Sequence, residues 1–409
     1  MPKTLYIGID ISSEDNIAQF MDSDGTTFRR SLRFPNTQTG LDELVETTSR
    51  LVAEHDIDHI HIGMEATGLY WWHLRESLAT APEFESLEVS IYVINPSLIR
   101  GFKKAYTTLP KTDAVDAWVI ADRLRFGRLK LITEDDLRYQ PLARLTRFRY
   151  TMTRSLTRDK NRALQLLFLK CSEYRKAAGR RTFGKASMAL LTELTAGEIA
   201  DKPLEELLGI ILSNTNNRLA DPEEFAEEIK RAARNSYRLN PKMQNSVDVA
   251  LAMTCENIRF FEGQCKKLDK VISRELKAIP QTLTSVLGIG DTLAAGIIAE
   301  VGDISRFHHE KALAKFAGLT WHRHQSGSFD AEETSLTKAG NHYLRYYLVE
   351  AANSLRVHNP EYKAFYAKKY QEVPKHRHKR ALVLTARKLV RLVYALLSTG
   401  QIYQGRRTS

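Results

Sequence analysis

The order of strand and helix patterns in residues 1–130 constrains the fold more than any other feature of the sequence. Apolar runs predict five strands, at residues 4–11, 16–21, 26–34, 60–64 and 89–94. Helical patterns alternate with the later strands, at residues 41–52 and 69–78, after Pro96 and from Asp113. The turn sequence Asp22-Ser23-Asp24-Gly25 joins the second and third strands as a hairpin. We therefore expect an α/β domain at residues 1–135.

Acidic residues stand at the ends of these elements. Asp10 ends the first strand and Glu65 ends the fourth, and a rigid strand end can project a carboxylate into a cleft. Asp113 and Asp116 are three residues apart, so both side chains lie on one face of a helix that Thr112 can cap. Four such carboxylates can hold two divalent cations that clamp the attacking and leaving oxygens of a phosphodiester. The pattern predicts two Mg²⁺ ions, with Mn²⁺ as a substitute, in an α/β domain of ribonuclease-H-like element order.

Other side chains near these carboxylates have two interpretations each. Lys111 either contacts a phosphate beside the metal ions or is an ordinary solvated lysine. Asp122, further along the same helix, is interpreted as a solvated or structural group. Tyr70, Trp71 and Trp72 can stack on a base, but aromatic residues early in a helix more often belong to a core, and we expect that here.

The chain is basic, and the positive charge is concentrated in one block. It has 60 Lys and Arg against 49 Asp and Glu, and this excess favours a polyanionic partner such as nucleic acid. Residues 139–185 hold thirteen basic and two acidic residues, a balance of +11 that equals the net charge of the whole chain. We expect Arg154, Arg158 and Arg162 in this block to contact phosphates; a merely basic protein is the alternative.

Nothing in the sequence indicates secretion or membrane insertion. The three cysteines lack the spacing of metal ligands or of a disulfide framework, no signal peptide opens the chain, and no long apolar run occurs. We expect a cytoplasmic protein without membrane contact.

Beyond residue 135 the patterns are helical. A helix follows Pro141, and a second one at residues 243–276 has the spacing of a coiled-coil seam, which closes a hairpin within the chain or joins two chains. A small helical insertion is expected between them, at about residues 186–242. The turn around Gly288 and Gly290 resembles a helix-hairpin-helix turn, which can offer backbone N–H groups to a phosphate; a plain turn is the alternative. Three domains are expected, at residues 1–135, 136–280 and 281–409.

A polar loop at residues 321–328 follows an apolar helix in the last of these domains. It contains Ser326, which on its own would be an ordinary loop residue. Lys338 marks a basic helix start downstream, where a phosphate contact is expected. A dense basic run at residues 375–380 continues into an amphipathic, basic C-terminal helix.

Several motifs taken together point to a known family. They lie at residues 6–10, 63–68, 93–96, 111–117, 287–290, 316–319, 326–327 and 337–341. With these motifs the chain resembles the DEDD transposases of bacterial insertion sequences over most of its length. Residues 186–245 carry no part of the resemblance.

The resemblance implies a chemistry that the spacing of residues does not give. The first domain would be of the Holliday-junction-resolvase type, with the four carboxylates as metal ligands. The last domain would supply a catalytic serine that forms a covalent phosphoserine intermediate, and Ser326 fits that position best. Family members often have Ser-Ser-Gly where this chain has Gln325-Ser326-Gly327, so Ser328 and Ser335 remain alternative nucleophiles.

The resemblance also implies partners. Family members act on donor and target DNA, and a structured guide RNA (a bridge RNA encoded beside the transposase) pairs with both. They work as homo-oligomers, dimers or tetramers, in which the carboxylates of one subunit meet the serine of another. A bacterial, nucleoid-associated location follows from these partners.

Two other classes of function remain open at this point. A hydrolytic Holliday-junction-resolvase-like nuclease would use the four carboxylates alone, without a serine or an RNA. An actin-like sugar kinase also opens with a sequence like Ile7-Gly8-Ile9-Asp10. The kinase is disfavoured because a second Asp-x-Gly phosphate loop and a Gly-Gly adenosine loop have no convincing place in the chain.

Overall fold

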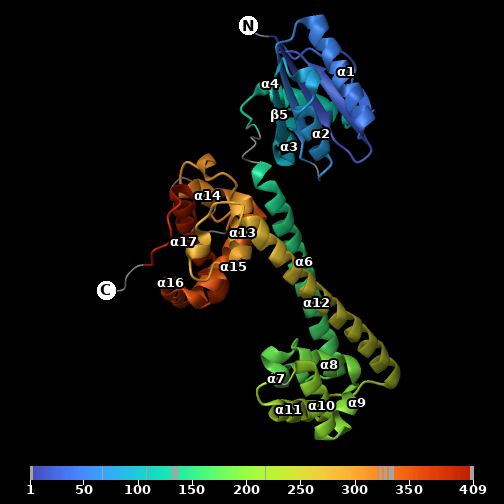
Figure 1. Ribbon diagram of the computed structural model, residues 1–409, viewed down its shortest axis with the longest axis vertical. Helices are drawn as coiled ribbons and strands as arrows, with labels where there is room; N and C mark the ends of the chain where they lie inside the picture. The colour runs from blue at the N-terminus through green and yellow to red at the C-terminus, as the bar shows by residue number, and fades with distance from the viewer. Residues whose placement is uncertain are drawn as a thin grey trace. The chain divides into compact units, whose positions relative to one another are not determined.

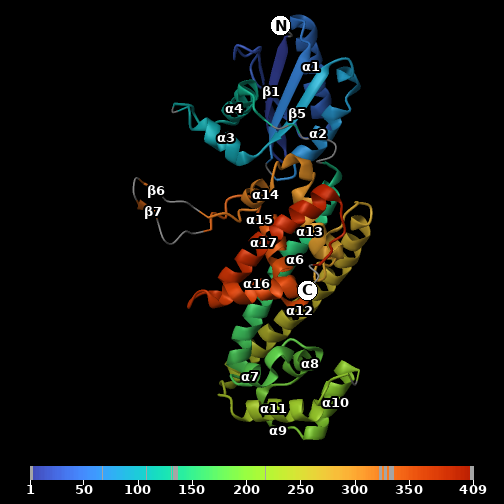
Figure 2. The ribbon, with the colours of Figure 1, turned by 90° about the vertical axis from the view of Figure 1, so that its left-hand side faces the viewer.

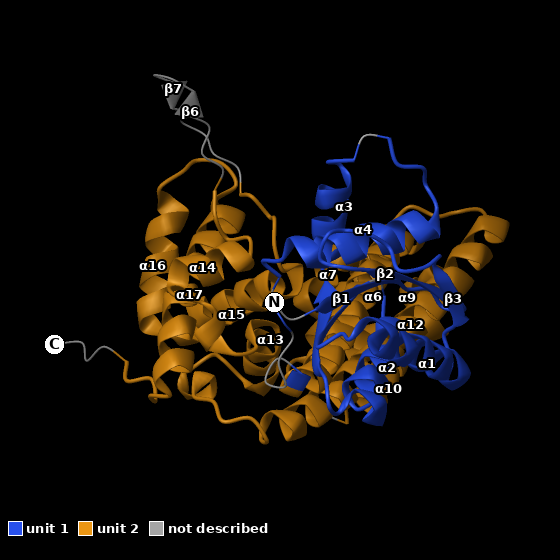
Figure 3. Ribbon diagram, turned by 90° about the horizontal axis from the view of Figure 1, so that it is seen from above, with its two compact units in different colours: residues 1–137 blue, residues 138–409 orange. Residues whose placement is uncertain are grey.

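The computed structural model describes residues 3–66, 68–106, 108–129, 131, 137–216, 218–321, 325–326, 329–330 and 336–405. It consists of two compact units, residues 1–137 and 138–409, which Figure 3 shows in separate colours. The first unit is a mixed α/β domain and the second is mostly helical (Figure 1). No helix among these described residues is long and apolar enough to cross a membrane.

The first unit is built on a five-stranded sheet with strand order β3-β2-β1-β4-β5. The strands are β1 (Thr4–Asp10), β2 (Asp15–Met21), β3 (Leu32–Pro35), β4 (His59–Glu65) and β5 (Glu88–Ile94). β1, β2 and β3 pair antiparallel in sequence, whereas β4 is parallel to β1 and β5 is parallel to β4. Because Ile9 of β1 pairs with Met64 of β4, the next residues, Asp10 and Glu65, end neighbouring strands at the same edge of the sheet.

The third strand is shorter than the sequence pattern predicts. Only Leu32–Pro35 pairs with β2 as a strand, and the preceding residues 28–30, predicted as strand, form a bend. The Asp22 carboxylate accepts hydrogen bonds from the backbone N–H groups of Asp24 (2.9 Å) and Thr26 (2.8 Å). These bonds stabilise the predicted turn at residues 22–25, after which an isolated bridge joins Met21 to Thr27. The Arg29 carbonyl oxygen then accepts a hydrogen bond from the Gln19 side-chain amide (3.0 Å).

Helices cover both faces of the sheet (Figure 2). On one face, α1 (Gln38–His55) and α2 (Trp71–Ala79) share a core with the odd-numbered residues of β1, and the short 3-10 helix η1 (Pro82–Phe84) joins it. On the other face lies α4 (Asp113–Phe126), with α3 (Pro96–Lys103) packed against it. Trp71 is buried and Trp72 packs against the first core, as predicted, whereas Tyr70 is 50% exposed.

Two long helices form the spine of the second unit. α6 (Gln140–Lys170) and α12 (Pro241–Leu276) lie side by side and run antiparallel (Figure 1). Ion pairs join them along their length: Arg149 with Asp269, Lys160 with Glu262 (2.7 Å) and Lys170 with Asp248 (2.8 Å). The helical hairpin within one chain, one of the two arrangements expected from the seam, is the one that this chain adopts.

Five short helices fold between the two arms of this hairpin. They are α7 (Tyr174–Ala178), α8 (Lys185–Glu193), α9 (Ala196–Asp201), α10 (Leu204–Thr215) and α11 (Pro222–Arg234), with the 3-10 helix η2 (Gly179–Arg181). They begin soon after α6 ends at Lys170, so the inserted segment starts earlier than residue 186. The segment has its own core around Tyr174 and Phe225, which is closed by the buried faces of α6 and α12.

The C-terminal helices pack around the start of α6 and the end of α12. They are α13 (Asp291–Val301), α14 (Glu310–Phe316), α15 (His342–His358), α16 (Pro360–Gln371) and α17 (Arg377–Thr399), with the 3-10 helices η3 (Leu283–Ser285) and η4 (Ile304–Arg306). A small hairpin of β6 (Gln325–Ser326) and β7 (Phe329–Asp330) lies between α14 and α15. α13 and α15 pack closely because Gly296 leaves room for the ring of Tyr347, from which a Cβ would be only 2.3 Å away.

Candidate active site

Two glycines bring the helix that carries Asp113 and Asp116 onto the sheet. A Cβ at Gly8 of β1 would lie 2.2 Å from the carbonyl oxygen of Ala117 in α4, and a Cβ at Gly63 of β4 would lie 2.8 Å from the Leu124 side chain. Only glycine allows this approach, which also explains the glycines in the two strand motifs. Because side chains alternate along a strand, Asp10 and Glu65, two residues after these glycines, face the same side as α4.

The four predicted carboxylates are therefore grouped at one edge of the first unit. Asp113 and Asp116 occupy the first turn of α4, whose N-cap Thr112 accepts a hydrogen bond from the Val115 N–H group. The pKa of Asp10 is raised from 3.8 to about 6, first by burial and then by the negative charges of Asp116, Asp113 and Glu65. Mutual repulsion of this kind requires that the four groups be neighbours.

A lysine that the sequence patterns did not single out contacts this group. The ammonium group of Lys103, in the last turn of α3, forms an ion pair with Asp116. Both side chains are about one-third exposed, at 29% and 33%. Lys103 thus provides positive charge to a cluster that otherwise contains only carboxylates, but thirteen residues separate it from Asp116 and no motif connects the two.

The carboxylates suit hard divalent cations, although they are not closed around a metal position. Among the described residues, no three acidic, histidine or cysteine side chains meet at metal-binding distance. One of the four, Asp116, forms an ion pair with Lys103. Carboxylate oxygens are nevertheless the donors that Mg²⁺ and Mn²⁺ prefer, and four of them lie near one another here.

Asp122 has a structural role rather than a solvated position. Its side chain is buried and accepts hydrogen bonds from the Tyr106 hydroxyl and from Arg125 (2.8 Å to Nε). Burial, followed by the hydrogen bond to Asp122, raises the pKa of Tyr106 to about 12. These bonds tie α4 to the end of the segment after α3. Lys111, one of the predicted phosphate contacts, is exposed two residues before Asp113.

The predicted nucleophile, Ser326, lies in β6, in the second unit, and pairs with Phe329 of β7. The hairpin is closed at its base by the segments before and after it. Thr337 N–H donates to the Thr320 carbonyl oxygen (2.8 Å), and a bridge joins Trp321 to Leu336. The alternative nucleophiles, Ser328 and Ser335, lie outside the described residues.

Two glycine motifs form the base of this hairpin. Asn341 N–H donates to the carbonyl oxygen of Phe316 (2.7 Å), and a Cβ at Gly340, whose φ is 124°, would lie 2.3 Å from that same oxygen. Gly318 likewise has no room for a Cβ beside Arg345, whose guanidinium donates to the carbonyl oxygens of Ala317 and Lys338 (3.0 Å each). Lys338 itself is exposed beside this base.

A buried carboxylate connects the hairpin base to α6 and α13. Glu300 of α13 accepts two hydrogen bonds from Arg147 of α6 (2.7 and 2.9 Å) and one from the side-chain amide of Asn341 (2.6 Å). The Glu300 side chain is fully buried. Asn341 also caps α15 by accepting hydrogen bonds from Tyr343 and Leu344 N–H groups. The position of the hairpin base is thus fixed by a fully bonded ionic network.

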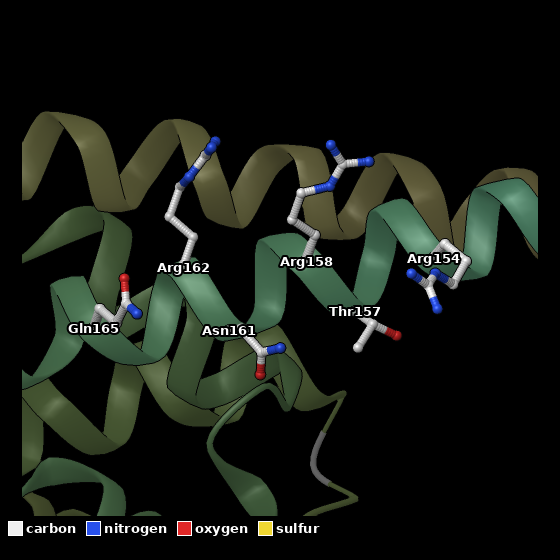
Figure 4. Close-up of a pocket in the computed structure, with 6 residues that line it drawn as sticks. All are labelled: Arg154, Thr157, Arg158, Asn161, Arg162 and Gln165. Carbon is white, nitrogen blue, oxygen red and sulfur yellow. The ribbon is translucent and has the colours of Figure 1, made fainter.

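The arginines predicted to contact phosphates line one surface of α6. They surround a hollow of about 590 Å³ lined by Arg154, Thr157, Arg158, Asn161, Arg162 and Gln165 (Figure 4). Arg154, Arg158 and Arg162 are four residues apart, so they form a row along one face, with about 6 Å of helix rise between neighbours. Within the described part of the chain, no carboxylate pairs with Arg154 or Arg158, which leaves both guanidinium groups available to phosphate.

The predicted turn at Gly288 and Gly290 has mixed geometry. Gly288 has a φ of 105°, which favours glycine, and Gly290 is the N-cap of α13. However, Asp291 in the first turn of α13 accepts a hydrogen bond from Ser273, so a carboxylate already lies at this helix N-terminus. The phosphate contact remains a prediction, and the geometry gives more support to the plain-turn alternative.

Comparison with known proteins matches both units. A family described as "Transposase" matches residues 7–170, which include the four carboxylates, and the "Transposase IS116/IS110/IS902 family" matches residues 280–367, which include the hairpin. The pilin gene-inverting protein of Moraxella lacunata is 25% identical over 99% of both chains. The transposase of insertion sequence element IS1111A from Coxiella burnetii is 28% identical over 44% of this chain and 53% of its own.

A third relative also comes from an insertion element. The insertion element IS110 uncharacterized 43.6 kDa protein of Streptomyces coelicolor is 25% identical over 75% of this chain and 76% of its own. The two family matches lie on the elements that carry the carboxylates and the serine hairpin, in the order in which the structure presents them. The chain belongs to the IS110 family of DEDD transposases, enzymes that cut and rejoin DNA.

Proposed function

We propose that this transposase cuts and rejoins DNA by a serine nucleophile assisted by two divalent cations, under the guidance of a structured RNA. The observation that carries the proposal is the grouping of Asp10, Glu65, Asp113 and Asp116 at one edge of the sheet. Burial and then the charges of the other three carboxylates raise the pKa of Asp10 to about 6. Such a group serves no evident structural purpose, because like charges destabilise the fold that holds them. The sheet order and the position of α4 support a ribonuclease-H-like fold of the resolvase type for this unit.

The four carboxylates would hold two Mg²⁺ ions, or Mn²⁺ in their place. Bound there, the ions would neutralise the scissile phosphate and favour the alkoxide form of the attacking hydroxyl. The chain's own contribution is to hold Asp10 and Glu65 on rigid strand ends and Asp113 and Asp116 on the first turn of α4. Lys103 beside Asp116 keeps a positive charge in the site.

Ser326 would attack the phosphorus atom in line. The Ser326 hydroxyl gives up its proton to water, and a bond forms between its Oγ and phosphorus. The bond from phosphorus to the 3′ oxygen breaks, and this oxygen takes a proton from water, so that no net proton is lost. A 3′-hydroxyl of the partner duplex would later attack the phosphoserine and release Ser326. The fixed base of the hairpin supports this role, since Glu300, Arg147 and Asn341 hold the segment that carries the serine.

Nucleic acid would be held by basic groups on both units. The arginine row on α6, Lys111 beside the carboxylates and Lys338 at the hairpin base are exposed cations placed for phosphates of donor DNA, target DNA and guide RNA. The enzyme would act as a homo-oligomer, a dimer or a tetramer, in which the carboxylates of one subunit serve the serine of another.

Cleavage of a junction-like DNA substrate tests the metal site. With Mg²⁺, the wild-type chain should cut, and Asp10→Ala, Glu65→Ala, Asp113→Ala and Asp116→Ala should each be inactive while remaining folded and able to bind nucleic acid. The exposed Glu256→Ala variant is the matched control and should cut normally. Full activity in EDTA, or in two of the four variants, would contradict the site.

The second candidate function is a hydrolytic resolvase without a serine nucleophile. It would also need the four carboxylates, so the cleavage test does not distinguish it from the recombinase. Trapping of a covalent intermediate does.

A further inference from the structure

A group of aromatic side chains lies where α15 begins against α6. The ring of Tyr150 on α6 meets those of His342, Tyr343 and Tyr346 on α15 edge to face, with centroids 5.9, 5.2 and 4.7 Å away. His342 and Tyr343 also contact each other, at 3.9 Å between centroids. We call these four residues the aromatic patch.

The aromatic patch is more exposed than a core requires. The next residue, Tyr347, is completely buried, and its hydroxyl donates to the Thr146 carbonyl oxygen (2.7 Å). Tyr347 therefore belongs to the core, whereas Tyr150, Tyr343 and Tyr346 are half-buried and His342 is exposed. Rings packed against each other and open to solvent on one side can accept a further flat group by stacking.

The aromatic patch lies next to the base of the serine hairpin. His342 and Tyr343 directly follow Asn341, which is bonded to Phe316 at the hairpin base and to the buried Glu300. A group stacked on the aromatic patch would therefore lie beside the segment that carries Ser326.

Cations extend from the aromatic patch along α6. The guanidinium of Arg147 lies 4.9 Å from the Tyr343 ring centre, and that of Arg154 lies 5.9 Å from the Tyr150 ring centre. Arg154 also begins the row that continues with Arg158 and Arg162, which project side by side from α6 in Figure 4. Arg162 also lies 3.8 Å from Asp159, whereas Arg154 and Arg158 have no carboxylate partner among the described residues. Stacking rings at one end of a row of exposed arginines are the two parts of a single-strand nucleic-acid site.

We propose that the aromatic patch stacks an unpaired base of the DNA strand being exchanged, and that the phosphates of this strand follow the arginine row. This inference rests on the proposed function for the position of Ser326. The base must have left the duplex, because the faces of a base inside a duplex are covered by its stacked neighbours. A strand that is to be joined to a new partner has to leave its complement, so such a base exists beside the cut. The DNA strand is the occupant because the family cuts and rejoins DNA.

Binding without cleavage tests the inference separately from the serine chemistry. We suggest fluorescence anisotropy of the full chain with a labelled single-stranded DNA oligonucleotide in EDTA, with the duplex of the same sequence in parallel. Tyr150→Leu and His342→Ala should each weaken single-strand binding by about five-fold or more, with little change for the duplex. Tyr150→Phe keeps the ring and should bind as the wild type does. Tyr237→Leu is the matched control, because this tyrosine, between α11 and α12, is 85% exposed.

Salt dependence separates stacking from charge. Arg158→Gln should lower the slope of log affinity against log salt by about 0.7 for one single-strand phosphate, whereas Tyr150→Leu and His342→Ala should leave this slope unchanged. Abasic sites placed one at a time along the oligonucleotide should weaken binding by the same factor as Tyr150→Leu when the site falls at one particular position. The inference is overturned if Tyr150→Leu, with an unchanged melting temperature, binds single strands normally, or if its loss is confined to single-stranded RNA. Neither result bears on whether Ser326 forms an adduct.

Discussion

Asp10 is a residue whose environment favours the proposed function at the expense of the stability of the fold. Its carboxylate is half-buried at a strand end and lies near three other carboxylates, so its pKa is about 6 instead of 3.8. The folded state therefore holds this proton more tightly than the unfolded state does. The free energy of unfolding must then fall as the pH rises from about 4 to about 6, because ionised Asp10 is disfavoured in the fold.

Asp10→Asn should therefore stabilise the metal-free protein while abolishing cleavage. In EDTA at about pH 7, we expect its melting temperature to exceed that of the wild type by roughly 2–6 °C, because the repulsion is removed. The difference should disappear below about pH 4, where wild-type Asp10 is protonated. Adding Mg²⁺ should raise the melting temperature of the wild type and not that of the variant. A variant that melts below the wild type in EDTA at neutral pH would contradict this account of Asp10.

Lys103 should compete with divalent cations for Asp116. In Lys103→Met the ion pair is lost, so Mn²⁺ should bind about two- to five-fold more tightly in a calorimetric titration. This factor corresponds to the free energy of a partly exposed ion pair. Lys104→Met removes the charge of the exposed neighbour and is the matched control. Equal Mn²⁺ affinity in the two variants would show that the Lys103–Asp116 contact does not oppose metal binding.

At this scale the sequence predicted the acidic residues better than their surroundings. Asp10 and Glu65 follow apolar strands, and Asp113 and Asp116 have helical spacing, so their grouping at one edge could be expected before the structure was known. Lys103 could not be expected, because its contact depends on how α3 packs against α4. The aromatic patch was missed for the same reason: Tyr150 and His342 are far apart in the sequence and meet only when α15 docks on α6.

At the scale of elements, one ionic network joins α6, α13 and the start of α15, so a single substitution there should lower the stability of the fold. Glu300→Ala would leave the half-buried Arg147 and the amide of Asn341 without their common acceptor. We expect a loss of about 1–3 kcal/mol in the free energy of unfolding, measured by urea denaturation, because water can reach part of the Arg147 side chain. The double variant Arg147→Met/Glu300→Leu should recover much of this loss, because it removes both charges. Additive losses in the double variant would contradict a coupled network.

The boundaries and partners of some elements could not be predicted from sequence patterns. The pattern at residues 26–34 predicted a longer third strand, but residues 28–30 form a bend, where the Gln19 side chain bonds the Arg29 carbonyl oxygen, and the strand covers only Leu32–Pro35. The pairing of α6 with α12 within one chain also could not be chosen from the seam alone. It depends on the five short helices between them, whose core fills the open end of the hairpin.

For the whole molecule, the carboxylates and the serine hairpin belong to different compact units. If the carboxylates of one subunit serve the serine of another, inactive subunits should complement each other. Mixed Asp113→Ala and Ser326→Ala chains should regain part of the wild-type strand-joining activity, since some pairings contain one intact carboxylate set and one intact serine. Each variant alone should stay inactive. Mixtures that remain inactive, although the two chains co-purify, would place both parts of the site within one subunit.

Trapping the covalent intermediate tests the central claim most directly. Wild-type reactions with Mg²⁺ and labelled DNA are stopped with denaturant, and the protein that retains the label is digested and mapped by mass spectrometry. We expect the DNA 5′ phosphate on the peptide containing Ser326, and no adduct with Ser326→Ala or in EDTA. An adduct on Ser328 or Ser335 would change the residue and keep the mechanism. Normal cleavage by Ser326→Ala, with no adduct at any serine, would contradict the account and make water the nucleophile.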